Sequence, residues 1–341
     1  MIKLDWFFCR VFVPAFLLVV ASSCSSDGDI QQLLKMRVEA PVFLECRPVS
    51  ATELVFSFST PVRVVSLNFD AEVELESVDE GLEVKVSFAA PLAAGKRITA
   101  DILVEDSGRN TLNVIVPFRA RNDRMPALII NEIRTDYSKP RVEFVEFFAP
   151  EAGNLAAMKF FIAGHSLSEP LYEFPAAEVS AGEYIVLHLR TLGEECVDET
   201  GTDLGLSGGD GAEKTARDFW FPGASRLLHR TSALWITDQD DRIIDAVLLC
   251  ENPSDWGKNN SSTAAELLGS KGAWLPSGSA ETGGEWIPGA DDAVSSKGTT
   301  ATRTICRDKD IPPARRAGNW YITATSNATP GKENSSKRYA P

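Results

Sequence analysis

Hydrophobic and polar residues alternate with a period of two along much of the chain after residue 38. The clearest example is LEVKVSF (82–88), in which Leu, Val, Val and Phe alternate with Glu, Lys and Ser. Successive side chains of a strand point to opposite faces of a sheet, so this period predicts half-buried β-strands. The predicted strands of this region are 41–47, 54–58, 62–69, 72–77, 82–88, 97–106 and 112–120.

Short strands that follow one another at roughly 8–12 residues are typical of an immunoglobulin-like (Ig-like) β-sandwich. We therefore predict a first Ig-like β-sandwich domain over residues 38–122. Two of its segments, TELVFSFSTPVRVV (52–65) and DILVEDSGRNTL (101–112), resemble a strand and a hairpin of bacterial Ig-like domains. In that hairpin Asp106 and Gly108 suit a tight turn, with the glycine at positive φ. The resemblance implies a spacer or an adhesive module.

A second group of strand-like runs occupies residues 123–250 and 299–334, after the junction at Arg124-Met125-Pro126. Between these two parts lies a long insert rich in Gly and Ser, residues 251–298. The sequence AAELL (264–268) is the one convincing helical pattern and predicts one or two helical turns there. The runs predicted as strands are 128–133, 142–148, 158–164, 171–175, 184–190, 232–238 and 242–249.

Several pieces of this second region are similar, in the same order, to the lamin-tail domain, an Ig-like β-sandwich of nuclear lamins and bacterial exported proteins. Ala181 stands where that family has Pro, and Asp241 where it has Gly. The resemblance implies a lamin-tail domain over 123–334, a C-terminal tail at 335–341, and an all-β chain of two tandem Ig-like β-sandwiches. The matching pieces are LIINEI (128–133), VEFVEFF (142–148), FPAAEVSAGEYIVL (174–187), ALWITDQDDRIIDAV (233–247), TATR (300–303) and ATPGKEN (328–334).

The N-terminus has the pattern of an export signal. Basic residues precede an apolar run, Val11 to Ala21, which is interrupted by Pro14. The run is shorter than the ~20 residues that a helix needs to span a bilayer. Ala21-Ser22-Ser23-Cys24 resembles a bacterial lipobox, which implies a signal peptide over 1–23, diacylation of the Cys24 thiol and a polar tether over 24–37. The alternative is an ordinary signal cleaved near Ser23. Two acyl chains anchor a protein firmly, so we expect lipid attachment to a membrane of the bacterial cell envelope.

Charge narrows the choice of partners. Lys plus Arg is 34 and Asp plus Glu is 48, which gives a net charge of −14. Removal of residues 1–23 takes away two basic residues and one acidic residue, so the mature charge is 32 − 47 = −15. Nucleic-acid binding needs clustered Lys and Arg and is not expected. An acidic protein is repelled by an anionic lipid surface, so we expect membrane contact through the lipid alone.

Few residues suggest a disulfide, a metal site or a catalytic site. Cys46, Cys196, Cys250 and Cys306 remain after Cys24, and Cys250–Cys306 is a candidate disulfide because these two flank the insert; four buried thiols are the alternative. A further candidate is a weak cation site of three carboxylates around one turn, although acidic turns are commonly just solvated. Its residues are Asp238, Asp240 and Asp241. Glu132, Glu143 and Glu146 are expected to serve the fold, and no cofactor is predicted.

Three tryptophans, Trp256, Trp274 and Trp286, lie in the insert and are candidate contacts for a protein or glycan partner. Alternatively, they pack against their own domain. Because no set of residues indicates catalysis, the sequence predicts a non-enzymatic, membrane-anchored lipoprotein for adhesion, scaffolding or envelope tethering. The alternative is an accessory or targeting subunit of an exported hydrolase such as a nuclease or phosphatase, since bacterial lamin-tail domains often accompany such enzymes.

Overall fold

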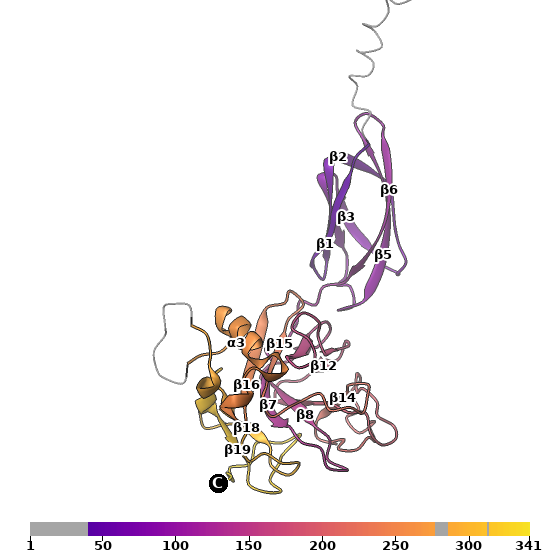
Figure 1. Ribbon diagram of the computed structural model, residues 1–341. Coiled ribbons are helices and arrows are strands. Elements are labelled where there is room, and N and C mark those ends of the chain that lie inside the picture. The colour runs from indigo at the N-terminus through magenta and orange to yellow at the C-terminus, as the bar shows by residue number, and fades with distance from the viewer. Residues whose placement is uncertain (1–39, 277–285, 312–313) are drawn as a thin grey trace, which may run out of the picture. The chain divides into compact units, whose positions relative to one another are not determined.

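The computed structural model describes residues 40–276, 286–311 and 314–341. These residues form two compact units, one made of 40–92 and 97–119 and the other of 93–96 and 120–341 (Figure 1). The predicted signal peptide 1–23, the lipidation site Cys24 and the tether 24–37 lie outside the described residues. Among the residues that the structure describes, we find no helix with the length and hydrophobicity of a transmembrane span.

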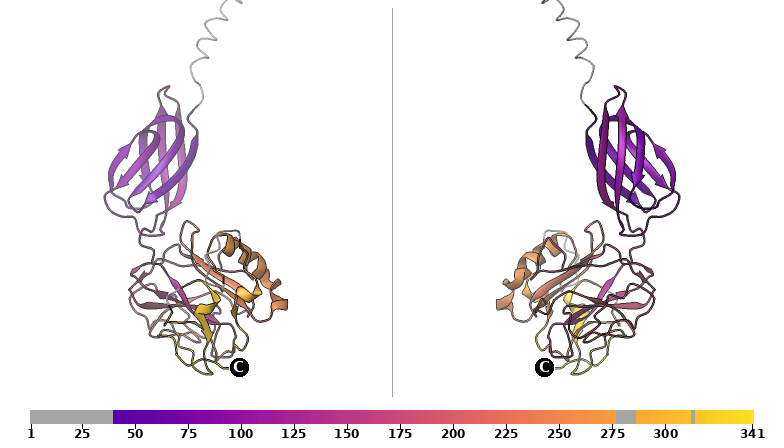
Figure 2. Two further views of the ribbon diagram at one scale, coloured as in Figure 1. Left: turned by 90° about the vertical axis from the view of Figure 1, so that its left-hand side faces the viewer. Right: turned by 90° about the vertical axis from the view of Figure 1, so that its right-hand side faces the viewer.

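The first unit is built from strands alone (Figure 2). Its hydrogen-bonded order is β3-β4-β2-β5-β6, with β1 also paired to β2, and the strand pairs are antiparallel. The alternation seen in the sequence places Leu54, Phe56 and Phe58 in the core of the unit. The strands are β1 (Phe43–Ser50), β2 (Glu53–Phe69), β3 (Leu75–Asp79), β4 (Gly81–Phe88), β5 (Arg97–Asp106) and β6 (Thr111–Arg119).

Strand β2 joins two runs that the sequence predicted as separate strands. Its first part pairs with β1 and β4, and its second part pairs with β5. The register on β4 shifts between Ser57 and Val62, and Pro61 lies within this shift. Proline has no N–H to donate to a ladder, so regular pairing cannot continue through it. One strand of 17 residues therefore changes partners at its proline.

The turn between β5 and β6 forms where it was predicted. The carboxylate Oδ1 of Asp106 accepts the backbone N–H groups of Gly108 at 2.8 Å and Asn110 at 2.9 Å. The residue at positive φ is Arg109, with φ 63°, and the expectation for Gly108 is wrong. The side chain of Asp106 stabilises the turn through hydrogen bonds, so it does not depend on a glycine at that position.

The second unit contains a six-stranded sheet ordered β14-β13-β8-β7-β18-β19 and a five-stranded sheet ordered β11-β10-β15-β16-β17, with β12 and β9 forming a separate pair. Its strands are β7 (Ile129–Arg134), β8 (Phe144–Ala149), β9 (Gly153–Asn154), β10 (Lys159–Ile162), β11 (Tyr172–Glu173), β12 (Glu178–Val179), β13 (Glu183–His188), β14 (Arg217–Trp220), β15 (Ser232–Thr237), β16 (Ile243–Cys250), β17 (Val294–Ser295), β18 (Ile305–Arg307) and β19 (Trp320–Ile322). Its helices are α3 (Ser261–Ser270) and the 3-10 helices η1 (Pro253–Asp255), η2 (Lys258–Asn260), η3 (Ala290–Asp292) and η4 (Ala317–Asn319).

The hydrophobic core of this unit joins the two larger sheets. Phe147 of β8 meets Phe160 of β10 edge to face, with ring centroids 5.5 Å apart. Aromatic pairs of this geometry add stabilisation beyond the area they bury. The helical pattern AAELL lies within α3, as predicted, and α3 packs beside β15 and β16 (Figure 1). The prediction of an all-β chain is confirmed, since strands dominate and α3 is the single α-helix of the described ranges.

Residues 335–341, predicted as a tail, make specific contacts in the structure. The backbone N–H of Tyr339 donates to the carbonyl of Ile322 on β19 at 2.8 Å. The guanidinium of Arg338 pairs with Asp308 at 2.6 Å and lies over the ring of Tyr321. The last residues of the chain are therefore held against the six-stranded sheet.

Candidate functional site

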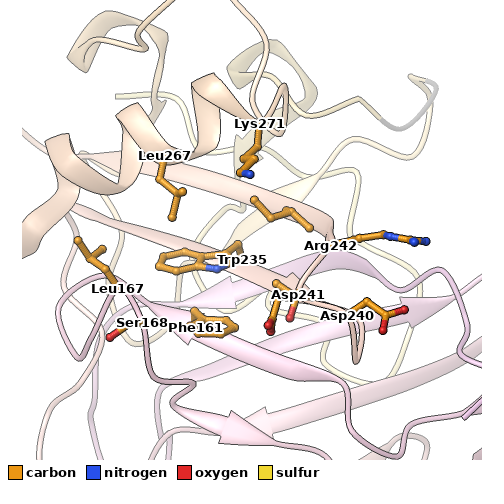
Figure 3. A pocket seen from close by; sticks show the side chains of 11 residues that line it. Phe161, Leu167, Ser168, Trp235, Asp240, Asp241, Arg242, Leu267 and Lys271 are labelled. Carbon is orange, nitrogen blue, oxygen red and sulfur yellow. The ribbon is translucent and has the colours of Figure 1, made fainter. Parts of the chain in front are cut away.

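A groove of about 590 Å³ lies on the five-stranded sheet, between α3 and the hairpin that joins β15 to β16 (Figure 3). Its size is in the range of small-ligand sites, roughly 300–1,000 Å³. Phe161 of β10 is paired across the strands with Trp235 of β15, and their rings stack with centroids 5.0 Å apart and planes 6° apart. The lining residues are Phe161, Leu167, Ser168, Trp235, Thr237, Asp240, Asp241, Arg242, Ile243, Leu267 and Lys271.

Local periodicity places the main lining side chains. Trp235 and Thr237 are two residues apart on β15, so they share one face of the sheet. Leu267 and Lys271 are four residues apart at the end of α3, so they share one face of the helix. Both point from the helix toward Trp235 (Figure 3). The groove therefore forms where helix and sheet turn these two faces toward one another.

The three aspartates predicted to hold a cation already have protein partners. Asp240 accepts a hydrogen bond from Nη1 of Arg121 at 2.9 Å, and this partner lowers the pKa of the Asp240 carboxyl. Asp241 pairs with Nζ of Lys159 at 2.7 Å. In the described part of the chain, no group of three or more His, Cys, Asp or Glu side chains could hold a metal ion. The prediction of a cation site at Asp238, Asp240 and Asp241 is therefore wrong.

The hairpin itself explains the role of the remaining aspartate. Oδ1 of Asp238 accepts the backbone N–H groups of Asp240 at 2.8 Å and Arg242 at 2.9 Å, which stabilises the turn. Asp241 has φ 61° in the left-handed region, where Asp is tolerated better than most residues. This is the position at which the lamin-tail pattern has Gly. The acidic cluster is thus the consequence of a turn and of two ion pairs.

Two cations of the groove, Arg242 and Lys271, form no ion pair within the described residues. The Lys271 side chain points into the groove, whereas Arg242 extends away from Trp235 (Figure 3). Thr237 is 3% exposed, and its Oγ1 has no hydrogen-bond partner in the parts of the chain that are described. A buried hydroxyl without a partner destabilises a fold, so its presence beside the groove is unusual.

The tryptophans of the insert pack mainly against their own domain. Trp274 is 1% exposed, and its indole N–H donates to the carbonyl of Asp292 at 2.9 Å, so the prediction that it contacts a partner is wrong. Trp256 and Trp286 are half-buried against the same core. Trp286 also lines a second groove, of about 650 Å³, that runs along α3 and includes Leu267 and the exposed Ile287. The alternative of self-packing describes these side chains best.

The predicted disulfide is not formed. Cys46, Cys196, Cys250 and Cys306 are all free thiols in the structure. Cys250 belongs to β16 of the five-stranded sheet, whereas Cys306 belongs to β18 of the six-stranded sheet, where it lies opposite Glu132. Burial and the charge of Glu132 raise the pKa of the Cys306 thiol well above its usual value, and burial raises that of Cys46 to about 12. These thiols are therefore poor nucleophiles.

Two buried glutamates hold the closing segment ATPGKEN (328–334) against the six-stranded sheet. Glu132 of β7 and Glu146 of β8 lie directly opposite one another. Glu132 accepts the Thr329 N–H at 3.1 Å, and Glu146 accepts the Gly331 N–H at 2.6 Å. Burial raises the pKa of both carboxyls, and the charge of Glu132 raises that of Glu146 further. These hydrogen bonds to the closing segment give the two glutamates a structural role.

Two further polar pairs belong to this unit, and the second of them is sealed from solvent. Glu143 accepts hydrogen bonds from Nε and Nη2 of Arg190 at 2.5 and 2.6 Å. His188 Nε2 lies 2.8 Å from Asp218 Oδ1, and the side chains of both residues are 1% exposed. The His188–Asp218 pair was not predicted from the sequence, because the two residues come from different strands and no motif marks them. A His–Asp pair closed to solvent cannot reach a substrate.

The fold and the groove define the class of protein. It is an all-β protein whose second unit carries a ligand-sized groove beside α3, the single α-helix among the described residues. Residues 126–322 match the family TP_1001_2nd, described as a protein second domain. This match covers more than half of the chain, so the protein belongs to that family. The groove lies entirely within the matched residues.

One similar protein is an uncharacterised protein of Treponema pallidum (strain Nichols), 29% identical over 213 residues. The aligned part covers 59% of this chain and 54% of that protein, so the chain spans about half the length of this relative. A solved structure of a DUF4876 family protein from Bacteroides thetaiotaomicron aligns with 79% of this chain and 89% of its own, at 13% identity and a TM-score of 0.28.

Proposed function

We propose that this protein is an exported, lipid-anchored, non-enzymatic component of the bacterial cell envelope that acts in adhesion, scaffolding or tethering. Its partner binds in the groove over Trp235. The groove carries the proposal, because it combines a ligand-sized volume, the partly exposed apolar side chains of Leu167 and Leu267, and a cation without an ion-pair partner in the described chain. The lipid anchor rests on the Ala21–Cys24 segment of the sequence, where an apolar run precedes a cysteine.

The absence of catalytic function is supported by how the polar side chains are used. Glu132 and Glu146 bind the closing segment, Glu143 binds Arg190, and the His188–Asp218 pair is sealed. A catalytic acid or base must come within hydrogen-bond reach of a substrate. The polar side chains of these three clusters bond to other parts of their own domain. This use of polar residues is expected of a binding module.

At the level of the fold, the proposal includes two tandem Ig-like β-sandwiches, the second being a lamin-tail domain. The positions of the resembling segments support it. LIINEI (128–133) overlaps β7, VEFVEFF (142–148) overlaps β8, and ALWITDQDDRIIDAV (233–247) covers most of β15 and β16 with their hairpin. The closing ATPGKEN segment lies on β7 and β8 through Glu132 and Glu146. Segments far apart in the sequence thus meet around one core.

The test of this proposal is a substitution that fills the groove and leaves the hydrophobic core unchanged. Ser168 lies exposed at its rim, so Ser168→Trp blocks access, whereas Ser254→Trp adds the same bulk at an exposed site outside the groove. The immobilised full-length protein is incubated with detergent-solubilised envelope, and retained material is quantified. We expect equal retention by wild type and Ser254→Trp and about a tenfold loss for Ser168→Trp. Equal retention by all three proteins would overturn the binding role of the groove.

A further inference from the structure

Two buried carboxyl groups face one another on the six-stranded sheet. Glu132 of β7 and Glu146 of β8 occupy directly opposite positions of the antiparallel pair, and both are 0% exposed. Side chains at such positions have Cβ atoms about 5 Å apart. The donors that the structure gives them are all neutral: the hydroxyls of Thr304 and Thr329, the amide of Asn131 and two backbone N–H groups. Two like charges so close together, away from water, disfavour one another strongly.

The closing segment (328–334) is attached to this pair of carboxyls. The backbone N–H of Thr329 donates to Glu132 at 3.1 Å, and that of Gly331 donates to Glu146 at 2.6 Å. Gly331 has φ 73°, and a Cβ at this position would lie 2.7 Å from the Thr215 hydroxyl, so glycine allows the close approach of the backbone. The segment therefore keeps water from the two carboxyls while it stays bonded to both.

The stretch 335–339 continues from the closing segment along the outer edge of β19. The N–H of Tyr339 donates to the carbonyl of Ile322 at 2.8 Å, and the N–H of Ala324 donates to the carbonyl of Lys337 at 2.9 Å. Most side chains of this stretch are exposed. A segment with few buried contacts opens at low cost in free energy, so its position depends on the buried contacts of the closing segment before it.

The charges around the pair come from several elements. Burial raises the pKa of both carboxyls, and the charges of Glu132 and of Glu213, in the loop before β14, raise that of Glu146 further. Arg134 of β7 acts in the opposite direction on the pKa of Glu132. Loss of the proton from Glu146 therefore creates a second buried charge, and water can stabilise it only when the closing segment lifts. The other titratable groups around the pair are Cys306 of β18, Tyr184 of β13, Tyr321 of β19, and Lys332 and Glu333 of the closing segment.

We propose that Glu132 and Glu146 form a proton-operated latch: while the pair holds a proton the closing segment stays in place, and loss of that proton releases residues 328–339 from the sheet. Release uncovers the outer edge of β19, with which residues 337–339 pair in the closed form. The closed form binds the proton more tightly than the open form, in which water reaches the carboxyls. By linkage, the equilibrium constant for opening rises by up to about tenfold per pH unit until the closed form is ionised as well.

The thiol of Cys306 reports the opening. It is 0% exposed and lies between Glu132 and Tyr321, which both bond to the stretch 329–335. The full-length protein in detergent micelles receives a short pulse of iodoacetamide at values from about pH 5.5 to about pH 8.5, and mass spectrometry measures labelling at each cysteine. Glu146→Gln has no proton to lose, so it corrects for the pH dependence of the thiol reaction itself. We expect labelling of Cys306 in wild type, relative to Glu146→Gln, to rise by up to about tenfold per pH unit and then to level off. A ratio that is constant with pH would overturn the proposal.

Two variants and a second thiol control this measurement. Glu333→Gln removes an exposed carboxyl of the closing segment and should leave the pH dependence unchanged. Gly331→Ala displaces the segment without altering either carboxyl of the pair, so Cys306 should be labelled rapidly at every pH. Cys250, buried in the five-stranded sheet, should stay unlabelled throughout. Labelling of Cys250 in step with Cys306 would show global unfolding and contradict a local latch, as would slow labelling of Cys306 in Gly331→Ala.

Amide hydrogen exchange of the wild-type protein tests the latch without any substitution. Exchange rates of the segment 328–339 are divided by the intrinsic chemical rate at each pH, and the hairpin between β5 and β6 serves as the reference. We expect protection of this segment to fall as pH rises while protection of the reference stays constant. Protection of residues 328–339 that does not change with pH, or that falls together with the reference, would overturn the latch.

Discussion

Asp245 of β16 and Arg307 of β18 form a buried ion pair that connects the two large sheets of the second unit, with Oδ2 and Nη2 2.5 Å apart. Their side chains are 7% and 5% exposed. Both residues also hold Ile130 of β7: Asp245 accepts its N–H at 2.8 Å, and Nε of Arg307 donates to its carbonyl at 2.8 Å. The Arg307 guanidinium lies 4.5 Å from the ring centroid of Trp320.

Loss of Arg307 is expected to be severe. Arg307→Met leaves the carboxylate of Asp245 buried without its cation, and breaking a buried pair from one side costs about 3–5 kcal/mol of unfolding free energy. Urea denaturation measures the change. Arg124→Met, which removes an exposed ion pair with Glu178, is the matched control and should stay within about 1 kcal/mol of wild type. A loss of similar size in the two variants would contradict the structural role of the pair.

The same pair shows where a sequence pattern reaches its limit. The segment TATR, which resembles the lamin-tail pattern, ends at Arg303, whereas the arginine buried in the structure is Arg307, in TICR (304–307). Arg303 instead lies over the ring of Tyr339. Both segments begin with threonine and end with arginine, and which of the two arginines is buried depends on Asp245, about sixty residues earlier in the chain. Local spacing cannot supply that contact.

The paired glutamates predict a pH dependence of stability. The pKa of Glu146 lies well above its ordinary 4.5 because of burial and the facing Glu132, so the folded state retains a proton that the unfolded chain releases. The corresponding stability is present below about pH 4.5 and is lost as pH rises toward the folded-state pKa. Gln does not titrate, so melting temperatures should shift in favour of Glu146→Gln between about pH 4 and 8.

The control for this experiment is Glu169→Gln, at an exposed glutamate of the same unit. Its difference from wild type should be small at every pH, because the Glu169 side chain is exposed and its replacement disturbs no buried contact. A difference between Glu146→Gln and wild type that stays constant with pH would show that burial does not hold the proton.

The unpartnered hydroxyl at the groove predicts a gain of stability. Thr237→Val keeps the shape of the side chain and removes an Oγ1 with no partner in the described structure, so it should raise the unfolding free energy by about 1–2 kcal/mol. Thr323→Val is the matched control, since its Oγ1 accepts the Thr304 N–H at 2.9 Å and its loss should destabilise. If Thr237→Val destabilised as Thr323→Val does, the hydroxyl would have a protein partner.

The strands were largely predictable from local alternation, and the groove was not. The periods of β4, β8 and β15 stand out in the sequence, and AAELL gave the helix. The groove instead combines Phe161, Trp235 and Lys271, which are more than thirty residues apart in the sequence. Its cation became identifiable only once the ion pairs of Asp240 and Asp241 were known. Charge that remains unpaired after folding is a property of the tertiary structure.

The lipid anchor gives a prediction that is independent of the groove. Cells producing the wild-type protein should incorporate labelled palmitate into it, and Cys24→Ala should abolish labelling because the acceptor thiol is lost. Cys196→Ala, at a thiol of the second unit, is the control and should remain labelled. Without any labelling of the wild-type protein, the lipoprotein assignment would fail.

Amide hydrogen exchange with and without the retained envelope fraction shows whether the second unit binds its partner in the groove over Trp235. Binding there should slow exchange in the hairpin Asp238–Arg242 and at the end of α3, because ligand contact suppresses local opening. The hairpin between β5 and β6 serves as the internal reference and should exchange at an unchanged rate. We expect slower exchange in the groove segments alone; protection elsewhere, with these segments unchanged, would exclude binding in the groove.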